Sequence, residues 1–323
     1  MALITTPTVL ILGAGASAPY GFPVGRALRE LIINKLGSSD IVRLLMNLGF
    51  RDRLISEFRT EFKYSQKQSI DSFLDLRKEF TDLGKAVIAA MLIPFELPDT
   101  LVDETSPLAA KRETVGKPWY SFLADRLTEI GEGRYGDHQL TIINFNYDRS
   151  LERAMFMALR SSFGLKPKEA VDKIGSTPIF YIHGKLGYLP DSHEHPQREY
   201  NPELTPEGIS VASAGIRVVH EEVSTHKDLE SAKMALAASE RIAFLGFGFH
   251  GANLDRLGLN RKFAWDNKYI YGSTYGMTEH QVKNVQARLH AASAHSSLLM
   301  PGMGDRRMGF DCLDALNNYP IID

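Results

Sequence analysis

The sequence is poor in cysteine: Cys312 is the only one in 323 residues. A single cysteine excludes an intrachain disulfide and any zinc site built from several cysteines, and it fits a reducing compartment. No run reaches the roughly 18 apolar residues that a membrane helix needs. The first residues also lack the basic segment and long apolar core of a signal peptide. We therefore expect a soluble, cytoplasmic protein that does not contact a membrane.

An excess of positive charge is also missing. Lys and Arg number 37 against 39 Asp and Glu, which gives a formal net charge of −2. Domains that bind nucleic acid through its phosphates are usually basic, so we expect no direct nucleic-acid binding. With 44% hydrophobic and 24% charged residues, the chain can build a full core in one large domain or two modest ones.

The most informative stretch that is present lies near the N-terminus. A short aliphatic run, residues 9–12, leads into Gly13-Ala14-Gly15-Ala16-Ser17, and residues 24–35 then show helical spacing of apolar side chains. The order strand, glycine loop, helix is how open α/β sheets bind a diphosphate, through backbone N–H groups and the helix dipole. The same loop also fits a tight strand–helix turn that holds no ligand, because lone glycine motifs are weak signals.

Two features of a dehydrogenase fingerprint are absent. The third glycine of Gly-x-Gly-x-x-Gly would stand where Ala18 stands. The acidic residue that binds a ribose normally ends a second strand about 20 residues further on, whereas residues 37–63 have a helical pattern. An ordinary dehydrogenase is therefore disfavoured.

Further along, apolar periodicity divides the chain into two parts. Residues 38–95 are expected to be helical, with one long helix over 70–91, followed by a loop over 96–118 and a helix over 119–132. The second half alternates strands and helices, which predicts a parallel sheet. The expected strands cover residues 139–145, 177–182, 241–246 and 268–272. The expected helices cover residues 151–160, 218–239, 278–290 and 309–318, and a long loop covers 187–210.

This pattern predicts an α/β fold. Its centre is an open, mostly parallel, Rossmann-like sheet flanked by helices, with no zinc ribbon. Residues 1–36 and 138–323 form this domain, and residues 37–137 form an inserted helical module.

Polar or glycine-bearing turns follow every expected strand. After the glycine loop come Asn146 and Asp148, then His183, then Gly246, Gly248 and His250, then Ser273 and Thr274. Because ligands of open α/β sheets bind beyond the carboxyl ends of the strands, these groups are expected to converge on one crevice. Three of these residues also have a structural alternative. Asn146 and Asp148 could cap the next helix, and His183 could be a hydrogen-bonded structural histidine.

Four segments in this order resemble the sirtuin-like family, the silent-information-regulator fold in its broad sense. They are Val9–Arg26 (VLILGAGASAPYGFPVGR), Thr141–Asp148 (TIINFNYD), Phe180–Gly184 (FYIHG) and Ile242–His250 (IAFLGFGFH). Sirtuins carry a GAG-S loop, a strand that ends in an N-x-D triplet, and a His-Gly pair, in the same order. The resemblance implies that NAD binds at the crevice.

The sequence also departs from the sirtuin deacylases. Their Gly-x-Pro-Asp-Phe-Arg stretch corresponds to residues 21–26, which keep Gly, Pro and Arg but lose the Asp and Phe that help hold nicotinamide. The four zinc cysteines are absent. The chain is therefore similar to the zinc-free bacterial branch whose members degrade NAD in anti-phage defence. That branch favours Asn-Tyr-Asp, as at 146–148, and residues 69–74 (SIDSFL) resemble its helical region.

This resemblance implies an NAD glycohydrolase that uses NAD as its substrate, needs no metal, and depletes NAD as a defence effector. NAD-dependent protein deacylation or ADP-ribosyl transfer is one alternative. A non-catalytic subunit that senses NAD or ADP-ribose is another. Since NAD depletion harms the host, we expect self-association, a partner defence protein that acts as sensor, or both.

The resemblance also assigns roles to residues. Gly13, Ala14, Gly15 and Ser17 are expected to hold the diphosphate through N–H groups and a hydroxyl, and Arg26 is a further cofactor-binding residue. Asn146 is expected to bind the ribose hydroxyls or the attacking water, and Asp148 to orient nicotinamide or fix the loop. His183 is the expected base, because the pKa of a free histidine is about 6.5. The residues expected along the adenosine half are Gly246, Gly248, Ser273 and Thr274.

Other residues are weaker candidates. His193 and His195 could ligate a metal, but they lie in a polar loop that fixes no geometry, and a solvated loop is the favoured interpretation. Asp71 and Asp75 are expected on the solvated face or in the first turn of their helix. Lys185 is expected to face solvent or a phosphate.

Overall fold

A five-stranded, all-parallel sheet forms the centre of the molecule, with strand order β3-β2-β1-β4-β5. The computed structural model describes residues 3–102, 116–218, 227–260, 263–265, 267–289 and 309–323. The strands are β1 (Thr8–Leu12), β2 (Leu140–Asn144), β3 (Ile179–Tyr181), β4 (Arg241–Leu245) and β5 (Tyr269–Gly272). The predicted α/β fold with an open parallel sheet is confirmed, and each strand lies within its predicted segment or one residue from it.

Alternate residues of the strands face two separate layers of core. On β1, Leu10 and Leu12 belong to one buried cluster, and Val9 and Ile11 belong to the other. This alternation follows from the two-residue period of a strand. Both sets are apolar because helices cover both faces of the sheet, as is usual for parallel sheets.

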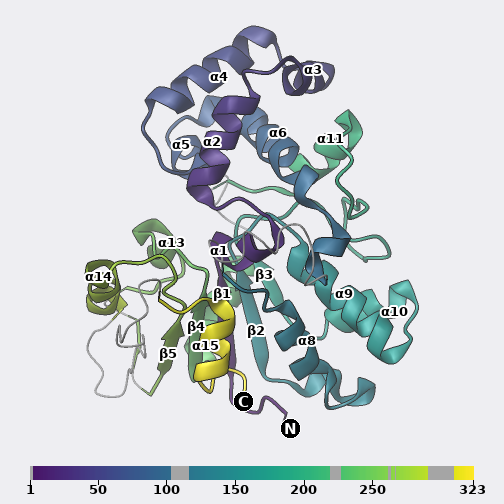
Figure 1. The fold of residues 1–323 in the computed structure, drawn as a ribbon, viewed down its shortest axis with the longest axis vertical. Helices are drawn as coiled ribbons and strands as arrows, with labels where there is room; N and C mark the ends of the chain where they lie inside the picture. Colours follow the sequence, from purple (N-terminus) through teal and green to yellow (C-terminus); the bar gives the residue numbers. More distant parts are fainter. Residues whose placement is uncertain (1–2, 103–115, 219–226, 261–262, 266, 290–308) are drawn as a thin grey trace.

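Figure 1 shows how the helices cover the two sides. The helices that pack around the sheet are α8 (Tyr120–Thr128), α9 (Ser150–Phe163), α10 (Pro167–Ile174), α12 (Lys227–Ala238), α13 (Gly251–Arg256), α14 (Glu279–Leu289) and α15 (Cys312–Asn318). Helices α8, α9 and α10 lie together beyond β2, whereas α13 and α14 lie beyond β4 and β5 (Figure 1).

A helical module stands above the carboxyl edge of the sheet (Figure 1). It consists of α2 (Gly25–Lys35), α3 (Ser39–Asn47), α4 (Asp52–Tyr64), α5 (Ile70–Leu74), α6 (Thr81–Leu92) and α11 (Pro206–Gly215). Helix α11 packs on α6, although it comes from a distant part of the sequence, and α8 packs on α9 instead of joining the module. The division into residues 1–36 with 138–323 and residues 37–137 stays a prediction.

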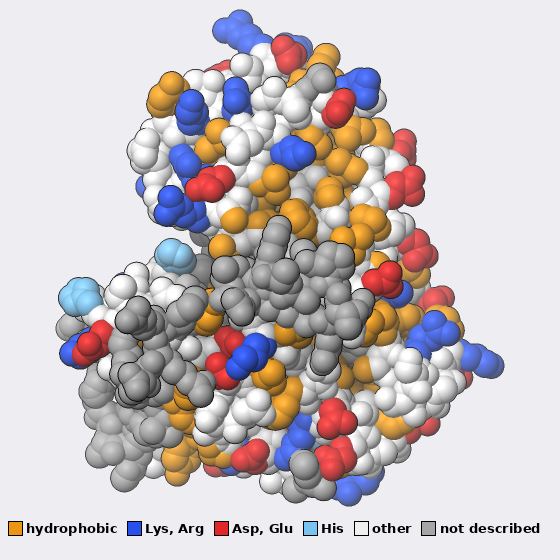
Figure 2. Space-filling view, viewed as in Figure 1, with side chains coloured by type: hydrophobic (Ala, Val, Ile, Leu, Met, Phe, Trp, Pro, Cys, Tyr) orange, Lys and Arg blue, Asp and Glu red, His pale blue; other side chains and the backbone are white. Residues whose placement is uncertain are grey.

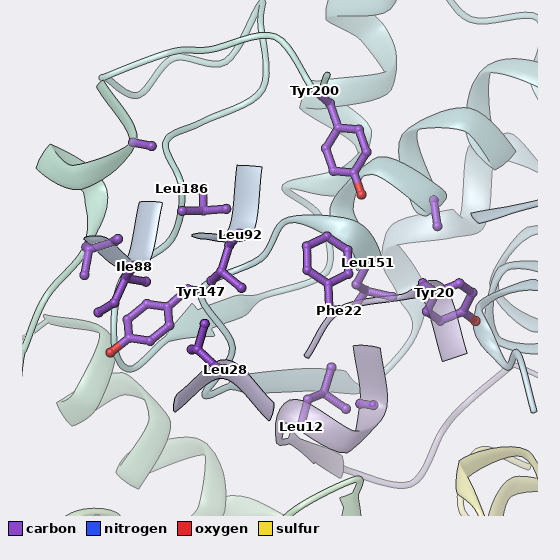
Figure 3. Close-up of a cluster of buried hydrophobic side chains, with 14 of the residues drawn as sticks. Leu12, Tyr20, Phe22, Leu28, Ile88, Leu92, Tyr147, Leu151, Leu186 and Tyr200 are labelled. Carbon is purple, nitrogen blue, oxygen red and sulfur yellow. The ribbon is translucent and has the colours of Figure 1, made fainter. Parts of the chain in front are cut away.

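Apolar side chains join the module to the sheet. Figure 3 shows Leu12 of β1, Leu28 of α2 and Leu92 of α6 in one cluster with Phe22 and Tyr147. The short α1 (Ala14–Ser17) leads from β1 into this contact. The module therefore holds a fixed position above the loops that follow the strands.

The predicted long helix over residues 70–91 is wrong. The chain forms α5, then a short 3-10 helix (Lys78–Phe80), then α6. Phe73 and Phe80 stack with ring centroids 5.9 Å apart, and both meet the Phe58 ring edge-on. Arg77 at the break donates to Glu61 over 2.7 Å. These contacts from α4 favour two crossing helices over one straight helix.

Three further differences concern element boundaries. The predicted loop over 187–210 ends at α11, where the Thr205 hydroxyl accepts the Gly208 N–H over 3.0 Å. The helix predicted over 119–132 ends at Thr128, and α10 was not predicted. Residues 103–115 of the predicted loop and 219–226 of a predicted helix lie outside the described residues. Within the described ranges, no helix has both the length and the apolar character needed to cross a membrane.

The N-terminal segment gives a prediction about pH. His138 is buried, accepts the Ile4 N–H at Nδ1 over 3.2 Å, and places Nε2 3.1 Å from the Leu127 carbonyl oxygen. This arrangement uses the neutral ring, and burial lowers the pKa of His138 below its ordinary value of 6.5. The unfolded chain therefore takes up this proton at higher pH than the folded chain, so His138 stabilises the fold above about pH 6.5 and loses that contribution at lower pH.

We expect the free energy of unfolding of the wild type to fall between about pH 8 and about pH 5.5, and to fall less steeply in His138→Gln. Urea unfolding of both chains at several pH values measures this difference. Equal slopes in the two chains would show that His138 does not carry the effect.

Candidate active site

A pocket of about 950 Å³ lies at the carboxyl edge of the sheet. The chain runs outward from β1 to β3 and then returns to β4 on the other side of β1. The topological switch point therefore lies between β1 and β4, where ligands of open α/β sheets bind. Figure 2 shows a notch at the left, between the helical module and the part that holds α13 and α14.

Nearly all of the predicted site residues line this pocket. They are Gly13, Ala14, Gly15, Arg26, Asn146, Asp148, His183, Gly246, Gly248 and Ser273. Strand ends that lie up to 260 residues apart in the sequence, as Gly13 and Ser273 do, therefore meet around one pocket, as expected for a parallel sheet. The exceptions are Ser17, which is buried behind the loop, and Thr274, which is buried and lies outside the pocket lining.

The glycine loop packs directly on the turn after β4. The Gly13 N–H donates to the Leu245 carbonyl over 3.1 Å, and the Gly15 N–H donates to the Gly246 carbonyl over 2.9 Å. A Cβ on Gly13 would lie 2.7 Å from the Gly246 carbonyl oxygen, and one on Gly246 would lie 2.0 Å from the Ala16 nitrogen. Close approach of two backbones therefore requires these glycines.

This contact corrects one part of the predicted chemistry. The N–H groups of Gly13 and Gly15 already donate to the β4 turn, so they are not free to hold a diphosphate as predicted. Ala14 lies between them and lines the pocket at the start of α1. Ser273 has a similar supporting position, because its hydroxyl accepts the Gly246 N–H over 2.8 Å.

The Ser17 hydroxyl contacts Asn146, not the pocket. The Asn146 Nδ2 atom donates to Ser17 Oγ over 3.0 Å and to the Gly13 carbonyl over 3.0 Å. Tyr120 lies 3.4 Å from the same hydroxyl, oxygen to oxygen. The predicted phosphate contact of Ser17 is therefore replaced by a role in holding Asn146.

These bonds orient the Asn146 amide. Its two Nδ2 hydrogens have acceptors in the glycine loop, which leaves Oδ1 as the side-chain atom that can accept a hydrogen bond from a ligand. The Asn146 backbone N–H donates to Asn144 Oδ1 over 2.9 Å. A local turn and the glycine loop thus fix Asn146 from both sides, four residues before α9 begins at Ser150.

Asp148 interacts with the start of α9. Its Oδ1 atom accepts the Ser150 N–H over 3.0 Å and also the Ser150 hydroxyl. Burial raises the pKa of Asp148 above its ordinary value of 3.8, and the bonds from Ser150 oppose that shift. Asp148 lies one residue before the N-cap position of α9, which is Arg149, so these bonds close a local turn in front of the helix. Of the two predicted roles they favour fixing the loop.

The His183 ring forms part of the pocket wall between two aromatic rings. It is 4% exposed, with its centroid 5.5 Å from that of Phe145 and 5.8 Å from that of Tyr147. The His183 carbonyl accepts the Arg217 N–H over 2.8 Å. The next residue, Gly184, has φ +66°, and a Cβ there would lie 2.1 Å from the Gly215 carbonyl oxygen. The His-Gly pair thus fits a crowded turn that fixes the histidine backbone.

Asp71 is a pocket residue that was not predicted from the sequence. It lies in the first turn of α5, as one of the predicted alternatives has it, and it lines the pocket. Its Oδ1 atom accepts the Tyr147 hydroxyl. This bond connects the helical module to the turn after β2, so a carboxylate from α5 stands beside the residues from the sheet.

The structure also corrects the prediction for Lys185. Lys185 is buried, and its Nζ donates to Glu152 over 2.7 Å. The same ammonium lies 4.6 Å from the centroid of the Tyr181 ring and 4.2 Å from that of Tyr188. It therefore faces neither solvent nor the pocket.

The remaining candidates differ in position. His193 is exposed and its Nε2 lies 3.0 Å from Asp172 Oδ1, outside the pocket lining. His250 lines the pocket, with its ring 3.2 Å from a Cβ built on Gly248. Arg26 stands at the mouth, exposed and paired with Glu30 over 3.1 Å.

The fold and the pocket together define a Rossmann-like α/β protein with a pocket at its switch point. No family model matches the chain, and no curated protein matches it either. The sirtuin-like resemblance stays a prediction that rests on the four segments quoted above.

Proposed function

We propose that the protein is an NAD glycohydrolase that cleaves NAD to nicotinamide and ADP-ribose. One observation carries the proposal: Asn146 and His183, from two different strand ends, line the same pocket beside the glycine loop. The pocket volume of about 950 Å³ lies within the range of small-molecule sites. Its position at the switch point is where a dinucleotide binds in folds of this class.

The chemistry needs few groups from the protein. The bond between ribose C1′ and the nicotinamide nitrogen breaks, and its electron pair neutralises the cationic ring. The ribose passes through an oxocarbenium-like state, as in other glycosidic cleavages. A water oxygen then bonds to C1′, and its proton goes to the base. These reaction steps require an oriented water, a base, and an environment that tolerates positive charge on the ribose.

The residues of the pocket fit these roles. The Asn146 Oδ1 atom, fixed by the two bonds of its Nδ2, can orient the water or a ribose hydroxyl. The His183 imidazole supplies the base. Asp71, held by the Tyr147 hydroxyl, brings a carboxylate to the wall from the module, where negative charge favours the developing cation.

The resemblance to defence effectors extends the proposal. Depletion of NAD harms the host, so such an enzyme is expected to have low activity until it is triggered. We infer control by self-association or by a partner protein that acts as sensor.

The test is product analysis. Incubation of the wild-type chain with NAD, over a range of protein concentrations, is expected to yield nicotinamide and ADP-ribose in equal amounts, measured by chromatography. The control His193→Ala removes an exposed imidazole away from the pocket and is expected to behave as the wild type. Release that depends on an acyl-peptide would instead indicate deacylation, and labelled protein would indicate ADP-ribosyl transfer.

One observation favours a second candidate, nucleotide sensing. Several polar groups of the predicted site, including the Asn146 Nδ2 and the N–H groups of Gly13 and Gly15, are occupied by contacts within the protein. A site fixed in this way can bind a ligand without turning it over. Tight binding of ADP-ribose or NAD with no loss of NAD would support sensing over hydrolysis.

A further inference from the structure

The glycine loop alone offers little to an anion. The N–H groups of Gly13 and Gly15 donate to the β4 turn, and the Ala16 N–H donates to the Gly13 carbonyl over 2.8 Å. The Ser17 hydroxyl is buried against Asn146. A diphosphate in this pocket therefore needs a cationic group from elsewhere.

The pocket lining offers two cationic side chains among the described residues, apart from histidines: Arg26 and Arg288. Arg26 is exposed at the mouth and already paired with Glu30. The Arg288 guanidinium makes no ion pair or hydrogen bond within the part of the chain that the structure describes. Its charge is therefore available to a ligand in the pocket.

Helix α14 directs Arg288 toward the pocket. Gln281, Asn284, Val285 and Arg288 all line it, and their spacing of three or four residues places them on one face of the helix. Val285 is buried, which anchors this face against the core. The helix therefore presents a polar and cationic stripe to the cavity.

The guanidinium rests on the start of α13. A Cβ built on Gly251 would lie 2.5 Å from one terminal nitrogen of Arg288, so the glycine leaves the room that the side chain occupies. His250, the residue before it, also lines the pocket. Figure 1 shows α13 and α14 next to each other on the β4–β5 side of the sheet. The planar guanidinium, with its donors not used by the described residues, suits the paired oxygens of a phosphate group.

We propose that Arg288, beside Gly251 and His250, forms the subsite that binds a phosphate of the dinucleotide. The inference rests on the proposed function and deepens it, because it assigns the anion of the substrate to the α13–α14 side of the pocket. The group that we expect Arg288 to bind is a phosphate carried by an adenine nucleotide.

Isothermal titration calorimetry with ADP-ribose, adenosine and inorganic pyrophosphate tests the subsite. We expect Arg288→Gln to weaken ADP-ribose binding by roughly ten-fold or more, since a charge-assisted hydrogen bond is lost, and to leave adenosine binding unchanged. The affinity of Arg288→Lys for ADP-ribose is expected to lie between those of the wild type and Arg288→Gln. Added salt is expected to weaken ADP-ribose binding more in the wild type than in Arg288→Gln.

Lys283→Gln is the matched control. It removes the same charge from the same helix, but Lys283 is paired with Glu279 over 2.6 Å and lies outside the pocket lining. This variant is expected to bind ADP-ribose as the wild type does. Because Arg288 is exposed, its replacement leaves the core of α14 intact.

Three results would overturn the subsite: equal ADP-ribose binding by Arg288→Gln and wild type, pyrophosphate binding as tight as ADP-ribose binding, or no ADP-ribose binding by the wild type. Nicotinamide release judges the proposed function separately. If ADP-ribose binding depends on Arg288 but no nicotinamide is released from NAD, the phosphate subsite is supported and the glycohydrolase function is contradicted.

Discussion

Replacement of His183 by alanine is expected to lower the rate of nicotinamide release by about 10²–10⁴-fold, the usual loss when a general base is removed. His183 is the histidine that the turn after β3 places in the pocket wall, between the rings of Phe145 and Tyr147. Without this imidazole, the described pocket lining keeps one histidine, His250, which comes from the turn after β4 instead. The measurement is the turnover of NAD at saturating substrate.

Two controls separate catalysis from folding in this experiment. His193→Ala removes an exposed imidazole that is paired with Asp172, and is expected to keep full turnover. ADP-ribose binding by His183→Ala is expected to persist, because the phosphate contact proposed above comes from α14. Unchanged turnover in His183→Ala would contradict the proposed base.

Replacement of Arg149 by methionine is expected to lower the free energy of unfolding by about 3–5 kcal/mol, because it leaves a buried carboxylate without its main partner. Arg149 and Glu96 are both 0% exposed. Arg149 Nε and Nη2 donate to the two Glu96 oxygens over 3.0 and 2.8 Å. The remaining donors reach the carbonyls of Tyr188, Arg198 and Glu199 over 2.8–3.0 Å.

This ion pair connects the loop over 188–199 to the helical module. Arg198 also donates to Glu96, and burial lowers the pKa of the Arg198 guanidinium. Since Arg149 directly follows Asp148, its loss is also expected to disturb the turn after β2.

Urea unfolding measures the loss of stability. Arg43→Gln removes one member of a surface pair with Asp40 and serves as the control, with little expected change. The double variant Arg149→Met with Glu96→Gln is expected to lose less than the sum of the single variants, since the two side chains interact directly. A loss below about 1 kcal/mol in Arg149→Met would contradict the importance of this pair.

The strands and the pocket could be predicted because their signals are local. Short aliphatic runs that end in glycine or polar residues mark the strands, and a parallel sheet brings all their carboxyl ends to one edge. That rule was enough to group Gly13, Asn146, His183 and Gly246 at one site. The same rule could not predict which N–H groups of the glycine loop are free to bind a ligand, because the contact between this loop and the β4 turn is set by tertiary packing.

The parts that sequence analysis missed depend on contacts between distant segments. The apolar spacing over 70–91 continues through the break between α5 and α6, which is fixed by Phe58 of α4. Asp71 reaches the site only because α5 stands above Tyr147, and Arg288 only because α14 packs beside α13. A local signal for α10 does exist: Pro167 opens the helix and Glu169 accepts the Lys166 N–H over 2.8 Å.

The central claim is that Asn146, held by the glycine loop, belongs to a site that cleaves NAD. The most direct test measures nicotinamide release from NAD by the wild type and by Asn146→Ala side by side, with thermal unfolding to confirm that both chains are folded. We expect release by the wild type and its loss in Asn146→Ala. Equal release by both chains, or no release by a wild type that binds ADP-ribose, would contradict it.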